Sequence, residues 1–94
     1  MSYVENDLIQ TIIDDLIFLN KKYGKKMFIV KLGNQCIDIT YNKRTFNLYI
    51  LHKNNNILLH LKYLNKLIYE IDISIGIRRY SIKLVMRAIK KYKP

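Results

Sequence analysis

The side chains that could perform acid–base or metal chemistry are few and scattered along the chain. After residue 20, the only carboxylates are Asp38, Glu70 and Asp72. A metal-dependent nuclease needs clustered carboxylates with a lysine nearby. Glu70 and Asp72 would share one strand face, and Asp38 would join them only if their strands meet. We therefore expect these acids to pair with lysines of a sheet, and we expect no metal site.

The thiol and imidazole side chains point to no other catalytic chemistry. Cys36 is the single cysteine, so the chain has no intrachain disulfide and no cysteine pair for zinc. No neighbouring pattern predicts an activated thiolate. His52 and His60 are not at a familiar ligand spacing, and we expect them to face each other across a hairpin. The sequence predicts no enzyme activity, no cofactor and no small-molecule substrate.

Anion binding is the chemistry that the sequence favours. The net charge of +10 is uneven, because residues 1–20 carry four acids and no base, whereas residues 21–94 carry seventeen bases and three acids. Residues 78–93 hold seven bases and no acid. Bases four residues apart on a helix repel one another, and nucleic-acid phosphates would relieve that repulsion. The predicted nucleic-acid-binding residues are Arg78, Arg79, Tyr80, Lys83, Arg87, Lys90 and Lys91.

A second basic group joins the predicted first helix to the first strand, and two further bases lie in the turn at 42–44. It would extend the positive surface if its turns lie beside the C-terminal helix. Ordinary solvation, and complementation of the helix dipole near the C-terminus, are the alternatives for both basic groups. The members of this second group are Lys21, Lys22, Lys25, Lys26, Lys43 and Arg44.

The elements that must position these side chains follow from hydrophobic periodicity. Apolar residues at helical spacing predict a helix over 4–23, with a capping box at Ser2 and Glu5 and a C-cap at Gly24. Alternation with period two then predicts strands, and a basic amphipathic helix follows at 79–92. The strands are expected over 27–32, 36–41, 46–51, 57–63 and 69–73, with turns at 33–34, 42–44, 53–56 and 65–66.

This order of elements predicts one α+β domain over residues 1–94. We expect a two-layer sandwich in which an antiparallel meander sheet of about five strands is flanked by N-terminal and C-terminal helices. Tyr41, Tyr63 and Tyr69 have the parity of core positions. Ile17 belongs to the apolar arc of the first helix, Asp15 lies at the edge of its polar face, and Phe18 projects from that polar face.

The second face of the sheet supports two hypotheses. Tyr49 with Lys31, His60 and Lys62 would suit single-stranded nucleic acid. Alternatively, apolar residues of the same parity would form a protein interface, because they expose more apolar surface than a monomer normally leaves wet. These are Met27, Ile29, Leu51, Leu58 and Ile68. We expect a homodimer, with Phe18, Tyr49, Leu51 and Leu58 as its candidate interface.

Two classes of function follow from these observations. The first is a small basic accessory protein that binds nucleic acid, DNA or RNA, through non-specific phosphate contacts. The alternative is a dimeric protein-interaction module, or a viral inhibitor that docks on an acidic host protein. High Ile, Lys and Asn usage is typical of A/T-rich genomes and favours a viral or mobile-element origin. No signal peptide or transmembrane segment is visible, so we expect an intracellular protein of the host cytoplasm or nucleus.

Overall fold

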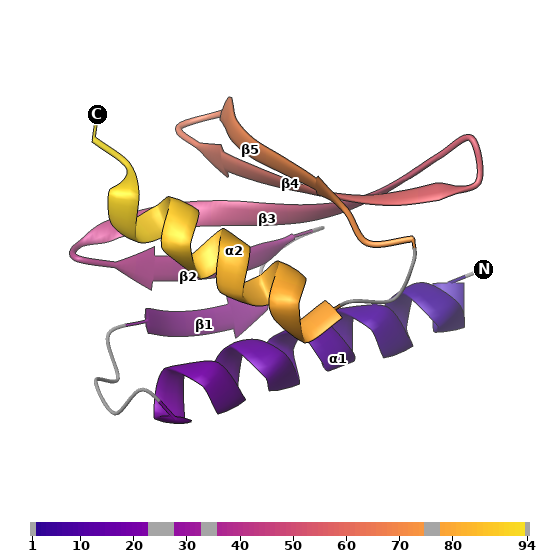
Figure 1. Ribbon diagram of the computed structural model, residues 1–94, viewed down its shortest axis with the longest axis horizontal. Coiled ribbons are helices and arrows are strands. Elements are labelled where there is room, and N and C mark those ends of the chain that lie inside the picture. The colour runs from indigo at the N-terminus through magenta and orange to yellow at the C-terminus, as the bar shows by residue number, and fades with distance from the viewer. Residues whose placement is uncertain (1, 23–27, 33–35, 75–77, 94) are drawn as a thin grey trace.

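The computed structural model describes residues 2–22, 28–32, 36–74 and 78–93 and confirms the predicted two-layer α+β architecture (Figure 1). Several sequence predictions lie outside what the structure describes. They are the C-cap at Gly24, the turn at 33–34, the orientation of Met27, the positions of Lys25 and Lys26, and the side chains of the capping box and of Arg78.

Five strands form an antiparallel meander in the order β1-β2-β3-β4-β5, and both helices cover the same face of the sheet (Figure 1). Each strand is hydrogen-bonded to the next one along the chain, as the short predicted turns require. The elements are α1 (Ser2–Lys22), β1 (Phe28–Leu32), β2 (Ile37–Tyr41), β3 (Arg44–Lys53), β4 (Asn56–Tyr63), β5 (Lys66–Asp72) and α2 (Arg78–Lys91).

The core lies between the helices and one face of the sheet. Ile39, Phe46 and Leu61 are almost fully buried on that face, and their parity is the one that the alternation predicted. The helices contribute residues at helical spacing, among them Leu16 and Ile82. The opposite face, which we call the outer face, carries the residues of the other parity.

Two-residue turns connect β2 to β3, β3 to β4 and β4 to β5. Both turn residues have positive φ in each case, which is the type I′ geometry that matches the twist of paired strands. The predicted polar loop at 53–56 is shorter than expected, because Lys53 and Asn56 pair with each other. The turn predicted at 65–66 lies one residue earlier, at Leu64 and Asn65.

A β-bulge between β4 and β5 changes one prediction for the outer face. Leu61 pairs with Tyr69, but Lys62 pairs with Leu67, so Ile68 is an extra residue in β5. Ile68 consequently packs against the core, and the prediction that it belongs to the outer face is wrong. Leu67 takes that place and is 46% exposed.

The buried stripe of α1 is narrower than the predicted apolar arc. Leu8, Ile12, Leu16 and Leu19 are buried, whereas Ile17 is 51% exposed, contrary to prediction. Asp15, predicted at the edge of the polar face, is 8% exposed. The reason is that α2 packs beside α1 and covers the side of the helix that carries Asp15.

Three aromatic rings fasten the end of α2 to the sheet. The centroid of Tyr92 is 5.8 Å from that of Phe46, edge to face, and 5.2 Å from that of Tyr63. Phe46 and Tyr63 are themselves 4.9 Å apart. Such pairs add stabilisation beyond their buried area. The C-terminal end of α2 is therefore held beside the start of β3 and the end of β4.

The β4–β5 turn predicts a stabilising substitution. Leu64 has a φ of 50° and is 79% exposed, so it has left-handed strain and buries little apolar surface. Leu64→Asn is expected to raise the free energy of unfolding by about 1 kcal/mol, since Asn tolerates this conformation. Urea denaturation followed by circular dichroism would measure the change.

Asn54 is the matched control, because it holds the same turn position with the same φ of 50°. Asn54→Leu should lose about the free energy that Leu64→Asn gains. Equal destabilisation by both substitutions would contradict the role assigned to turn strain.

Candidate functional site

Bases gather at one end of the molecule, which we call the basic end. The ends of α1 and α2 lie at this end together with the β2–β3 and β4–β5 turns (Figure 1). The aromatic contacts of Tyr92 independently place the end of α2 beside the start of β3 and the end of β4. The bases of these segments are Lys21, Lys22, Lys43, Arg44, Lys66, Lys90, Lys91 and Lys93.

The acids lie elsewhere. Asp38 is at the start of β2, and Glu70 and Asp72 are near the end of β5. In a meander these strand ends lie opposite the β2–β3 turn. Asp7 and Asp14 belong to the first two-thirds of α1. The fold thus separates these acids from the bases of the basic end. It also brings the turn that carries Lys43 to the end of the molecule where α2 ends.

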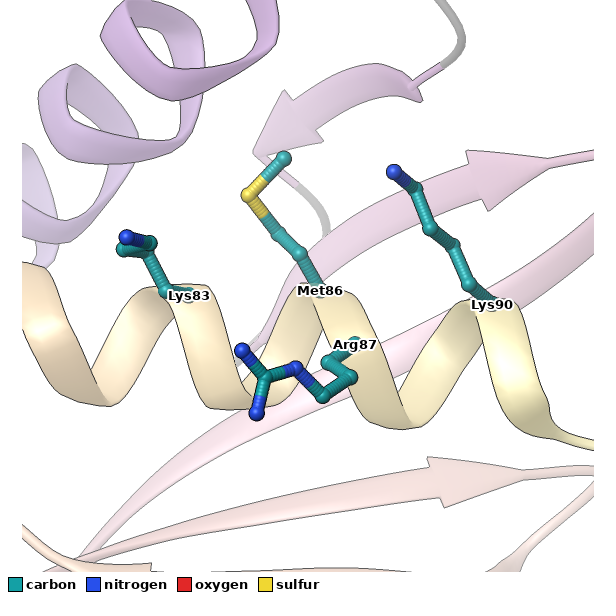
Figure 2. A pocket seen from close by; sticks show the side chains of 4 residues that line it. All are labelled: Lys83, Met86, Arg87 and Lys90. Atoms are coloured by element: carbon teal, nitrogen blue, oxygen red, sulfur yellow. The ribbon is translucent and has the colours of Figure 1, made fainter. Parts of the chain in front are cut away.

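An open groove of about 330 Å³ runs along α2, lined by Lys83, Met86, Arg87 and Lys90 (Figure 2). Figure 2 shows Lys83, Met86 and Lys90 rising from the same side of the helix, with Arg87 projecting from another side. Met86 is buried and gives the groove an apolar floor. No carboxylate is among the lining residues within the described part of the chain. The arrangement suits an extended anion.

Arg79, one of the predicted nucleic-acid-binding residues, contacts α1 instead of lining the groove. Its Nε and Nη2 atoms each lie 3.5 Å from Oδ1 of Asp15, and its guanidinium stacks 4.2 Å from the centroid of the Phe18 ring. The helices cross here, so Arg79 neutralises a buried carboxylate and covers one face of Phe18. The other predicted nucleic-acid-binding bases whose side chains are described lie further along α2. They are Lys83, Arg87, Lys90 and Lys91, and Tyr80, in the first turn of the same helix, is 57% exposed.

The acids of the outer face pair with neighbours other than lysines, so that prediction is wrong. Asp38 accepts a 2.8 Å hydrogen bond from Asn47, its partner in register. Glu70 is 2.5 Å from Nε2 of His60, again a cross-strand partner. Strand register, and not charge, determines these partners, because a side chain reaches the residue directly opposite it on the next strand.

The two histidines do not face each other as predicted. His52 is opposite Ile57 and His60 is opposite Tyr49, because the turn between β3 and β4 contains only two residues. Among the described residues, no three His, Cys, Asp or Glu side chains are grouped so that they could hold a metal ion.

Cys36 lies in a polar cluster on the outer face. Its Sγ donates to Oδ1 of Asp38 at 3.4 Å. Burial, followed by the hydrogen bond and charge of Asp38, raises the pKa of this thiol above its ordinary value. The pKa of Tyr49 is raised too, mainly by the charge that an ionised Cys36 would carry beside it. The cluster therefore favours a protonated thiol at neutral pH.

The predicted interface residues are divided between two surfaces. Phe18 lies on α1, partly covered by Arg79. Tyr49 lies on the outer face beneath the Nζ atom of Lys62, 5.1 Å from its ring centroid. Leu51 and Leu58 form a cross-strand pair on the outer face. They do not form one patch with Phe18, and the homodimer stays a prediction.

Sequence reasoning missed the groove and the contribution of Lys66 to the basic end. The groove depends on how α2 lies against its neighbours, which no local pattern specifies. The position of Lys66 in a predicted turn could have placed it at the basic end. In a meander, alternate turns lie at the same end, so bases of the β2–β3 and β4–β5 turns belong together.

Comparisons of the chain with protein-family models, with curated proteins and with solved structures found no match. Within the described residues, neither helix has the combination of length and apolar character needed to cross a bilayer. The geometry and charge of the surface are therefore what indicate a function.

The pair of Asp15 and Arg79 predicts a coupled loss of stability. Arg79→Met should lower the free energy of unfolding by about 1–2 kcal/mol, because it leaves a buried carboxylate without its charged partner. Asp15→Asn together with Arg79→Met should cost less than the sum of the two single changes. Urea denaturation of the four proteins of this cycle would measure the coupling.

Arg87→Met is the matched control for that cycle, since Arg87 is exposed on the same helix. It should leave stability within about 0.5 kcal/mol of the parent protein. Strict additivity of the two changes at Asp15 and Arg79 would contradict the pairing.

Asp72 predicts a pH-dependent contribution to stability. Its Oδ1 accepts a 2.8 Å hydrogen bond from the amide of Ser74, whose Oγ in turn accepts from the amide of Ile57 at 2.7 Å. The hydrogen bonds from Ser74 lower the pKa of Asp72 below its ordinary value. A carboxyl whose pKa is lower in the folded state stabilises above its unfolded pKa, and that contribution is lost as the pH falls through the folded pKa.

Asp72→Asn should therefore lower the urea midpoint at pH 7, and the difference from the parent protein should shrink below about pH 4. Denaturation curves for both proteins between pH 7 and pH 2.5 would test this. A difference that stays constant over that range would show that ionisation of Asp72 contributes nothing.

Proposed function

We propose that this chain is a small nucleic-acid-binding accessory protein that contacts phosphates through the groove on α2 and the adjoining basic end. The observation that carries the proposal is that Lys83, Arg87 and Lys90 all line one open groove. Lys90 belongs to both surfaces, so the groove and the basic end adjoin at this residue.

The spacing of these bases suits a repeating anion. Lys83 and Lys90 are seven residues apart, which is about 10.5 Å along a helix, and Arg87 lies between them. A polyanion lying along α2 would meet several bases at once, and each neutralised phosphate would release counterions. A single small anion would use only part of this row.

The lining of the groove favours binding without base specificity. Lysines are flexible point charges that bind phosphates in many geometries. Met86, on the floor, offers no hydrogen-bond donor or acceptor that distinguishes one base edge from another. Phosphate contacts position a protein on nucleic acid but carry no sequence information directly.

The separation of charge supports approach in one orientation. The acids of α1 and β5 lie away from the basic end, so the molecule is strongly dipolar as well as positive. A field of this kind turns the basic end toward a polyanion and raises the association rate at low salt.

A second candidate function is a protein-interaction module, and exposed apolar residues on the outer face favour it. Ile29 is 66% exposed, and Leu51 and Leu67 are also exposed. A partner protein bound to this face would be held independently of the groove. Its binding should survive substitutions in α2 that abolish nucleic-acid binding.

Charge reversal in the groove tests the proposed function. Lys83→Glu with Arg87→Glu should weaken binding to DNA and RNA oligonucleotides by at least an order of magnitude, because two phosphate contacts become repulsive. With four contacts, from Lys83, Arg87, Lys90 and Lys91, the slope of log affinity against log salt should be about −3 to −4, and the double reversal should reduce it by about 2. Fluorescence anisotropy between 50 and 200 mM salt would measure both.

The matched control is Lys31→Glu with Lys53→Glu, which makes the same change in net charge away from the groove and the basic end. It should have a much smaller effect on affinity. Equal weakening by the two double reversals would mean that net charge alone drives binding. Retained affinity after the groove reversal would overturn the proposal.

A further inference from the structure

The exposed side of α1 carries a strip of charge opposite to that of the groove. Asp7, Gln10 and Asp14 are exposed on that side, and we call them the acidic strip. Nε2 of Gln10 donates a 2.9 Å hydrogen bond to Oδ1 of Asp14, which orders the strip along the helix. Asp7 and Asp14 are seven residues apart, about 10.5 Å along the axis.

The acidic strip has the spacing of the groove. Lys83 and Lys90 are also seven residues apart on one side of α2. If the two helices run antiparallel, Asp14 can oppose Lys83 while Asp7 opposes Lys90. The antiparallel direction also brings opposite ends of the helix dipoles together.

The same alignment matches the remaining exposed side chains. It places Gln10 at the level of Arg87 along the paired helices. It places Ile17, which is 51% exposed, opposite Tyr80, which is 57% exposed. The exposed surfaces of Ile17 and Tyr80 would thus be buried beside the two ion pairs. Apolar burial would supply most of the binding free energy, because exposed ion pairs contribute little.

We propose that a second copy of this chain occupies the groove, with the acidic strip of one copy lying antiparallel along α2 of the other. The contact between Asp15 and Arg79 holds α1 and α2 of one copy side by side. A twofold axis near this crossing would therefore let two copies make the contact twice. Such an interface is self-complementary and closes as a dimer.

The net charge of +10 limits the strength of this dimer. Two such copies repel each other at long range, whereas the opposed strips attract only at contact. At 0.15 M ionic strength the repulsion is screened beyond about 8 Å, so the local pairs decide the outcome. The dimer hides the groove, so a polyanion and a second copy exclude each other there. This competition, unlike the dimer itself, rests on the proposed function.

A charge-swap experiment tests the dimer. One variant reverses the acidic strip, Asp7→Lys with Asp14→Lys, and the other reverses the groove, Lys83→Glu with Lys90→Glu. Size-exclusion chromatography with light scattering should give the mass of a dimer for the parent protein and of a monomer for each variant alone. An equimolar mixture should restore the dimer, because each reversed surface then meets its reversed complement.

Two controls keep the result interpretable. Lys31→Glu with Lys53→Glu makes the same change in net charge as the groove reversal and should leave the parent mass unchanged. Circular dichroism of each variant should retain the parent helix content. Restoration on mixing cannot come from unfolded chains, so it distinguishes a lost interface from a lost fold.

Three outcomes would overturn the inference: a monomeric parent protein, a dimer that persists in either variant alone, or a mixture that stays monomeric. The proposed function fails separately, through oligonucleotide binding that survives the reversal of Lys83 and Arg87. A monomeric parent protein that binds oligonucleotides would reject the dimer and leave the proposed function standing.

Discussion

The structure depends on one constraint, which is that both helices cover the same face of a single sheet. Every strand must bury one parity and leave the other to solvent, so Ile39, Phe46 and Leu61 enter the core while their neighbours do not. The bulge at Ile68 keeps β5 within this constraint, because one extra residue restores core parity along the rest of the strand. Shifting the register of any strand by one residue would exchange its buried and exposed sets.

The same constraint determines where charge can lie. α2 must direct Ile82 and Ile89 to the sheet, and its bases therefore face outward along the groove. On the outer face, bases and acids meet partners across the strands. His60 meets Glu70, and Lys62 lies over Tyr49. These contacts leave the groove and the basic end as the surface where positive charge is concentrated, and no described carboxylate lines the groove.

The crossing of the helices divides the basic row into two parts with different roles. Arg79 lies close enough to Asp15 to neutralise it and stacks on Phe18, so its guanidinium helps to hold α2 against α1. Lys83 and Lys90 lie about one and about three turns further on and line the groove. Along this part of its length α2 diverges from α1 (Figure 1). α2 therefore packs against α1 at its start and offers a charged surface along the rest of its length. The groove and the acidic strip lie close to the same crossing, which is why one copy can present both to another.

The amino-acid sequence by itself determined the element order, the alternation that selects the core face and the excess of bases in the last helix, because each depends on spacing between neighbours in the chain. It placed Tyr63 and Ile82 correctly for that reason. Only the tertiary structure decided that Asp15 is buried, that Arg79 pairs with it and that the β2–β3 turn lies at the same end of the molecule as the end of α2. It likewise decided the partners of Asp38 and Glu70. These outcomes depend on helix crossing and strand register, which bring together residues far apart in the chain, and no local period encodes such contacts.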